Sequence, residues 1–268
     1  MSYAAVMVYV EPGGGLSGRV EVARHLALRL DSNLIGVSAW MPPPPFIVEG
    51  VVVDPSPAAA ELKLMQETLD KRGELFRAAA TVKGRAVEWR SGLEFPTEFV
   101  ARESRAADLI VVGRDENQHD PYRSTDAGAL VLRAGRPVLV VPPGEKPGEL
   151  RRALVAWKDT REARRAIRDA LPLLRMAGEV MVVEVLDSGT SMSVSRDLSK
   201  SSQITVVAHR AVPNEVTAGN AVLHMEEEQS FDLVVSGAYG HSRLGEWLFG
   251  GVTQELLTSS PVCCLLSH

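Results

Sequence analysis

The chain has 268 residues, a formal net charge of −5 and a pI near 5.8, and 45% of its residues are hydrophobic. This length allows two ordinary domains, and the acidic balance disfavours a surface that coats nucleic acid, which normally carries a basic excess. No basic leader precedes the first apolar residues, and no apolar run reaches the roughly 18 to 20 residues that cross a bilayer. We therefore expect a soluble, cytoplasmic protein with neither a membrane nor nucleic acid as its partner.

Short β-branched runs alternate with helical patterns along the first half, which is typical of parallel strands joined by crossover helices. The predicted strands lie at 4–10, 33–39, 86–90, 108–113 and 137–141, and the predicted helices at 18–31, 58–80, 95–106 and 126–134. The prolines at 42–45 predict a stiff loop that leads to an apolar run beginning at Phe46, or else a short partner motif.

A linker rich in proline and glycine at 142–148 separates a second half of the same pattern. Its predicted strands lie at 152–157, 179–186, 204–209, 232–237 and 261–266, and its predicted helices at 160–175, 191–200, 216–229 and 251–259. Thr160 is placed to cap the first of these helices. The arginines that follow are mixed with acids and are typical of a solvated helix face. Cys263 and Cys264 are neighbours in an apolar strand, which predicts buried, unreactive thiols.

The two halves share nearly identical segments. Asp108–Gly113 and Asp232–Gly237 are close copies 124 residues apart, and Pro137–Val140 matches Pro261–Cys264 at the same separation. At the front of the halves Ala5–Val10 matches Ala153–Trp157 more loosely and with another offset, because the loops differ in length. An internal duplication explains these matches better than chance does.

A glycine-rich loop follows the predicted strand at 232–237 and leads into a predicted helix. Glycines let the backbone turn tightly and approach a ligand, and the free N–H groups at the start of a helix favour negative charge. This order of elements predicts a site for a phosphate-bearing ligand.

The glycine spacing of this loop, met by Gly237, Gly240 and Gly250, resembles the universal stress protein family in its tandem form, and the similarity spans both halves. The resemblance implies two doubly wound α/β units, each with a five-stranded parallel sheet of order 3-2-1-4-5. It implies ATP, or ADP or AMP, with or without Mg²⁺, across the gap between the first and fourth strands. It also implies antiparallel pairing of the two fifth strands, so that one chain forms a pseudo-dimer, with further homodimerisation left open.

Carried over to this chain, the family pattern implies that the loop holds ribose and phosphates through the backbone amides of six residues, Gly237, Gly240, Gly250, Gly251, Val252 and Thr253. Ala156 and Trp157 correspond to positions that line the base pocket, although Trp157 fits a core position equally well. His241 and Arg243 are either cationic contacts to phosphate or solvated loop residues, and the run at 247–249 anchors the loop or meets a partner.

Two departures from the family pattern bear on the ligand. Gly251 stands where relatives that bind ATP usually have Ser or Thr, which removes a hydroxyl donor worth about 0.5 to 1.5 kcal/mol. Lys158 stands where the first strand commonly ends in Asp, and it either neutralises phosphate or is an ordinary exposed lysine.

The first half has acids where the second has loop glycines. Glu116 matches Gly240 and Asp126 matches Gly250, while Ala127 matches Gly251. We therefore expect residues 1–143 to form a degenerate unit without nucleotide and residues 149–268 to form the unit with the nucleotide loop. We predict no catalytic residue and no metal site, since neither a zinc spacing nor a phosphate-loop lysine motif is present. The expected function is a stress-response protein that binds nucleotide without catalysis or hydrolyses it slowly; the alternatives are an interaction scaffold that has lost the nucleotide and, third, an enzyme.

Overall fold

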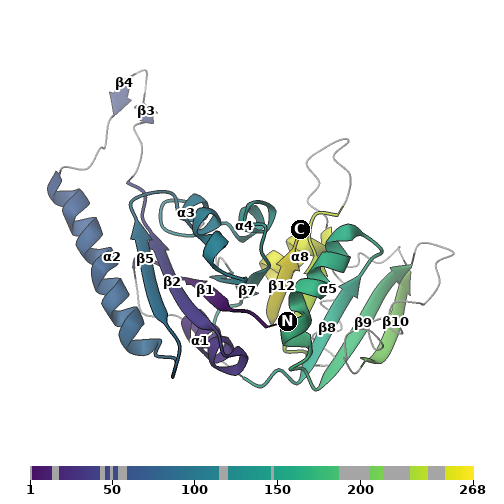
Figure 1. Ribbon diagram of the computed structural model, residues 1–268. Helices are drawn as coiled ribbons and strands as arrows, with labels where there is room; N and C mark the ends of the chain where they lie inside the picture. Colours follow the sequence, from purple (N-terminus) through teal and green to yellow (C-terminus); the bar gives the residue numbers. More distant parts are fainter. Residues whose placement is uncertain are drawn as a thin grey trace.

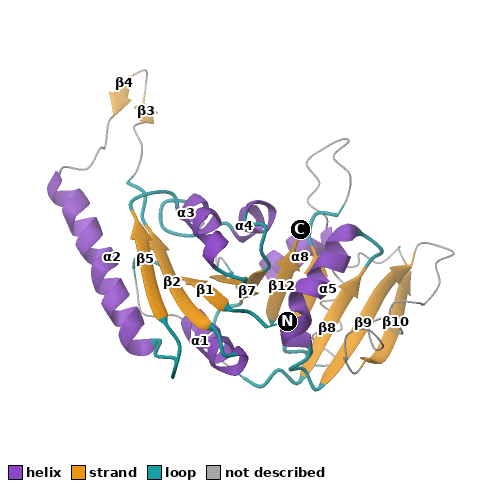
Figure 2. Cartoon of the chain, viewed as in Figure 1, coloured by secondary structure: helices purple, strands orange, loops and turns teal. Residues whose placement is uncertain are grey.

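The architecture is that of a computed structural model, and the residues it describes are 2–13, 18–42, 46–48, 51–53, 59–114, 120–145, 148–186, 206–213, 230–240 and 251–268. One ten-stranded sheet runs through the molecule, in the order β10-β9-β8-β11-β12-β7-β6-β1-β2-β5 (Figure 1). Helices cover both faces of this sheet (Figure 2).

The first half contributes five parallel strands in the predicted order 3-2-1-4-5. Its main elements are β1 (Ala5–Tyr9), α1 (Gly18–Leu30), β2 (Asn33–Ala39), α2 (Ala59–Ala79), β5 (Val87–Gly92), α3 (Pro96–Glu103), the short 3₁₀ helix η1 (Ser104–Ala106), β6 (Leu109–Gly113), α4 (Ala127–Arg133) and β7 (Val138–Val141). Strands β1, β2, β6 and β7 are buried because both faces of the sheet carry helices, which explains their apolar runs, whereas the edge strand β5 is only partly buried.

The second half repeats this order with parallel strands. Its described elements are β8 (Arg152–Trp157), α5 (Arg161–Leu174), β9 (Glu179–Leu186), β10 (Val206–Pro213), β11 (Leu233–Gly237), α8 (Gly251–Ser259) and β12 (Cys263–Ser267). Helix α5 begins where Thr160 accepts a hydrogen bond from the backbone N–H of Ala163 at 3.2 Å, so the predicted cap is confirmed. The helices predicted at 191–200 and 216–229 lie outside the described residues.

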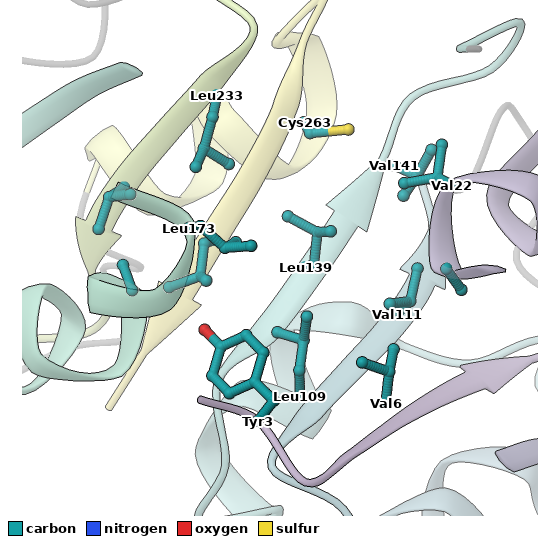
Figure 3. Packing of buried hydrophobic residues seen from close by; sticks show 14 of the residues in the cluster. Tyr3, Val6, Val22, Leu109, Val111, Leu139, Val141, Leu173, Leu233 and Cys263 are labelled. Carbon is teal, nitrogen blue, oxygen red and sulfur yellow. The ribbon is translucent and has the colours of Figure 1, made fainter. Parts of the chain in front are cut away.

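The two halves meet along their fifth strands. Strands β7 and β12 pair antiparallel, with Leu139 opposite Leu265, as the family resemblance implied. The hydrophobic cores continue across this seam: Leu109 and Leu139 of the first half share a cluster with Leu173 of the second (Figure 3). Cys263 and Cys264 are buried here without a disulfide, as predicted, and burial raises the pKa of Cys263.

Two local features differ from the predictions. The segment after the four prolines forms a small antiparallel hairpin of β3 (Phe46–Val48) and β4 (Val51–Val53), set apart from the main sheet. The sheet register also corrects the loose match at the front of the halves, in which Ala5 was set against Ala153. Val6 pairs with Leu109 and Ala153 pairs with Leu233, so Val6 and Ala153 are equivalent. A shift of one residue would exchange the faces of the strand, so this register decides which side chains are compared below.

Candidate functional site

The candidate site lies at the carboxyl ends of β8 and β11, the first and fourth strands of the second half. These strands are neighbours, with Ala156 opposite Ser236, and the chain leaves them toward different sides of the sheet. Such a switch in strand order opens a crevice outside the sheet, where ligands of this fold class bind. Ala156 is only partly buried, while Ser236 is 4% exposed and its hydroxyl donates to the carbonyl of Gly237 at 3.0 Å.

The start of α5 forms one wall of the site. Thr160 caps the helix, and Glu162 in its first turn is 4% exposed and pairs with the exposed Arg161. Burial alone would raise the pKa of Glu162, but hydrogen bonds from Arg161 and the helix backbone outweigh it, and the pKa is lowered. An ionised carboxylate therefore sits at this end of the helix, where the dipole stabilises it.

The two described glycines of the loop meet this wall. A β-carbon added at Gly237 would lie 2.5 Å from the backbone nitrogen of Ala163, so the close approach of β11 to α5 itself requires glycine. A β-carbon added at Gly240 would lie 3.1 Å from Oε2 of Glu162 and 3.4 Å from Oγ1 of Thr160. Gly240 is otherwise exposed, so a side chain here would crowd the mouth of the site.

Helix α8 follows the loop and begins at Gly251, where an anion-binding helix is predicted to begin. Val252 is partly buried against the core and Thr253 is 3% exposed, which directs both residues toward the protein rather than to open solvent. The other predicted loop residues, His241, Arg243 and Gly250 together with the run at 247–249, lie outside the described residues.

Trp157 and Lys158 are set differently from Ala156. Trp157 is 7% exposed and belongs to the core cluster beneath α5, on the opposite face of the sheet from Ala156. Of the two roles considered for Trp157, a base-pocket residue or a core residue, its packing is that of a core residue. Lys158 is partly exposed beyond the end of β8, and its carbonyl accepts from the N–H of Thr160 at 2.7 Å. Of the three strand-end residues predicted to line the site, Ala156 therefore lies on the crevice face.

The equivalent crevice of the first half is filled by its own side chains. Tyr9 occupies the position of Ala156; it is fully buried, and its hydroxyl donates to the carbonyls of Arg123 and, at 3.2 Å, Ala39. Arg19 fills the space beside Gly113, where a β-carbon would lie 3.0 Å from Cζ of the guanidinium group, and it pairs with Glu11 at 2.6 Å.

The start of α4, the helix that follows this crevice, is capped by a side chain of the protein itself. Asp126 caps α4 by accepting from the backbone N–H of Ala129 at 2.9 Å, so its carboxylate takes a place that an anion would need. Tyr239 of the second half reaches the same helix, since a β-carbon on Gly128 would lie 2.7 Å from the tyrosine hydroxyl. Burial raises the pKa of Tyr239, with a smaller contribution from Asp126. The predicted counterpart Glu116 lies outside the described residues.

Sequence reasoning missed several residues of these two crevices. Ser236 and Glu162 line the second, and Tyr9 and Arg19 fill the first. The only sequence signal was that Glu162 stands in the first turn of a helix, a common place for an acid in any helix. Which strand end faces it could be known only from the sheet register.

Comparison with known proteins agrees with this architecture. A sequence model of the Universal stress protein family matches residues 149–268. Among solved structures, a universal stress protein from Archaeoglobus fulgidus is 16% identical with a TM-score of 0.69, covering 98% of this chain and 95% of its own.

Two proteins from Pseudomonas aeruginosa have TM-scores of 0.61 and cover 98% of this chain and 92% of their own. One is described as functionally unknown and is 14% identical; the other is described as a putative universal stress protein and is 16% identical. No curated protein matched the chain.

Fold and site together define a protein of two doubly wound α/β units in tandem, joined through their fifth strands, with a crevice at the carboxyl ends of the first and fourth strands. Residues 149–268 match the universal stress protein family in sequence, and the two halves together share the fold of the universal stress protein from Archaeoglobus fulgidus. Within the described residues, no helix is both long and apolar enough to cross a membrane.

Proposed function

We propose that residues 149–268 bind an adenine nucleotide, ATP in the first instance, as part of a stress response, and that residues 1–143 form a structural copy without nucleotide. The observation that carries this proposal is the exchange of Tyr9 for Ala156 at equivalent strand ends. A tyrosine fills the crevice of the first half, whereas a methyl group leaves the crevice of the second half partly exposed.

The polar groups around the second crevice suit the two ends of a nucleotide. The start of α8 offers backbone N–H groups without an acid in its first turn, which favours phosphate. Glu162 is an acceptor beside Gly240 and favours donors such as ribose hydroxyls. A phosphate at about 4 Å from that carboxylate would be repelled by roughly 4 kcal/mol at an effective dielectric near 20. The phosphates are therefore assigned to the α8 side and the sugar to the α5 side.

We assign these residues a binding role and no catalytic one. Mg²⁺ would reach the site with the phosphates and would offset their charge near Glu162. The family match to residues 149–268 and the glycine spacing of the loop support the same half of the chain as the nucleotide unit.

The test is nucleotide binding by the full chain, followed as the thermal shift with ATP and magnesium. At a ligand concentration of about 100 Kd, binding stabilises the native state by about 2.7 kcal/mol. Gly240→Glu places a second carboxylate beside Glu162. Even a quarter of the unscreened repulsion of about 4 kcal/mol would weaken ATP binding about fivefold, so the variant is expected to lose at least that much affinity.

Gly148→Glu is the matched control, because a β-carbon at Gly148 meets no atom within 4 Å and the change in charge is the same. It should bind ATP as the unaltered chain does. An unaltered chain that shows no shift at millimolar ATP, and carries no nucleotide through purification, would leave the interaction scaffold as the better description.

A further inference from the structure

A pocket lies on the seam between the halves, and its lining includes none of the residues assigned to the candidate nucleotide site. It has a volume of about 440 Å³ and is formed by the starts of β1 and β6, the residues before β7, and the middle of α5. Ten residues line it: Ser2, Tyr3, Asp108, Arg136, Pro137, Arg164, Arg165, Arg168, Asp169 and Pro172. A pocket of this size accommodates a small molecule.

The base of this seam pocket is fixed by one hydrogen bond between the halves and by another within the second half. The hydroxyl of Tyr3, from the first half, donates to the backbone carbonyl of Asp169 on α5 at 2.6 Å. Ser267 donates to Oδ2 of Asp169 at 2.9 Å. Figure 3 shows the Tyr3 ring beside Leu109, at the edge of the shared core. The pocket is therefore held by a packed core rather than by loops.

The charge of the seam pocket is positive, since four arginines face two aspartates. Arg164 is paired with Asp159 at 2.5 Å, outside the pocket lining, and Arg136 lies 3.9 Å from Asp108. Arg165 donates to the backbone carbonyl of His268. In the part of the chain that the structure describes, Arg168 forms no salt bridge, and its charge acts on Asp169.

The pseudo-symmetric position in the molecule lacks this charge. A smaller pocket of about 80 Å³ lies between α1 and the start of the second half, with Asp232 where the seam pocket has Asp108. When α1 and α5 are aligned from their first residues, Val22, His25 and Leu26 stand where α5 has Arg165, Arg168 and Asp169. The duplicated fold does not require arginines at these positions.

We propose that the seam pocket binds a small phosphorylated molecule, held by the guanidinium groups of Arg136, Arg165 and Arg168 from both halves. Guanidinium groups offer paired donors that match phosphate oxygens, and two phosphate groups can be met from several sides at once. Because Arg136 belongs to the first half and the other two to the second, the ligand bridges the halves.

Inorganic pyrophosphate is the probe, titrated calorimetrically into the full chain at constant ionic strength. Arg136→Gln and Arg168→Gln are each expected to weaken its binding about tenfold, the effect of losing a charge-assisted hydrogen bond. Arg77→Gln is the matched control, an exposed arginine on α2 that does not line the pocket, and it should bind as the unaltered chain does. Higher salt should weaken binding.

The proposal would be overturned by no binding at millimolar pyrophosphate or by an equal loss in Arg77→Gln. Loss of pyrophosphate binding in Gly240→Glu would also overturn it, since that would place the anion at the nucleotide loop. Citrate is the comparison ligand that distinguishes a phosphate site from a general anion site, because it carries carboxylates, each of which engages one guanidinium group. Weaker binding of citrate supports the proposal, and equal or tighter binding contradicts it.

Discussion

The crevices of the two halves differ in their side chains, although the strands that form them are arranged in the same order. Strands β1 and β6 end in a crevice that contains Tyr9 and Arg19, whereas β8 and β11 end in one lined by Ala156 and Ser236. The backbone of a duplicated unit can thus be kept while the side chains at one strand end change from small to large.

The same comparison applies on the seam. The first helix of each half packs near the start of the other half, yet α1 contributes Val22, His25 and Leu26 there, whereas α5 contributes arginines. Each half therefore differs from its copy at positions where the fold makes no demand. Positions where the fold makes the same demand are alike: the repeated Asp108 and Asp232 both accept backbone N–H groups at the start of the first strand.

The largest expected effect concerns the packing of the two halves along β7 and β12. Leu265 is fully buried opposite Leu139, so Leu265→Ala should cost about 2 to 5 kcal/mol of unfolding free energy. Because the core is continuous, protection from hydrogen exchange should fall in both halves. Leu132→Ala, at a leucine that is 46% exposed on α4, should change stability little. Loss of protection confined to residues 149–268 would show instead that the halves unfold independently.

The next largest effect is expected from a substitution that gives the second crevice the tyrosine of the first. Ala156→Tyr reproduces Tyr9 at the equivalent position and should weaken ATP about 100-fold or more, since the ring takes the space assigned to the ligand. Ala156→Ser keeps the size and should bind as the unaltered chain does. Isothermal titration measures the ATP affinity of both variants, and circular dichroism checks that they fold. Undiminished ATP binding by the tyrosine variant would place the nucleotide elsewhere.

Most of the architecture could be predicted because it rests on local patterns. Buried parallel strands read as apolar runs, and the near-repeat of Asp108–Gly113 at Asp232–Gly237 marks the duplicated units, so 33–39, 152–157 and 179–186 match the observed strands. The hairpin of β3 and β4 was missed because four prolines directly precede it and favour a loop. A short hairpin outside the main sheet has little periodicity to reveal it.

The site was less predictable because its residues come together only through the fold. Ala156 was predicted from family resemblance, but its contrast with Tyr9 depends on a sheet register that the loose match at the front of the halves did not define. Gly237 was predicted as a ligand contact, which stays a prediction, and the structure shows that packing against Ala163 requires glycine there. Such a packing demand cannot be seen until the helix is placed.

A smaller effect is expected at a feature that the two halves share, the repeated aspartates Asp108 and Asp232. Asp108 accepts from the N–H groups of Ala4 and Ala5, and Asp232 accepts from those of Arg151 and Arg152. Asp108→Ala and Asp232→Ala should each cost about 1 kcal/mol, because both carboxylates are partly exposed. Urea denaturation of the two variants measures the difference directly. A cost at one position several times that at the other would mean that the repeated aspartates do not serve the same role.

The smallest effect concerns Asp169, which has no counterpart in the first half because Leu26 takes its place when the helices are aligned. Burial raises the pKa of Asp169 above the ordinary 3.8, against opposing effects of Ser267 and the nearby arginines. The folded protein therefore binds this proton more tightly than the unfolded chain does, so stability falls as pH rises from the ordinary carboxyl range through the raised pKa. Asp169→Asn keeps an acceptor for Ser267 and removes this loss, so the variant should gain stability over the unaltered chain toward neutral pH, by less than about 1 kcal/mol. Thermal unfolding across the acid-to-neutral range checks the sign, and a variant that instead becomes less stable toward neutral pH would show that attraction to the arginines outweighs the cost of burial.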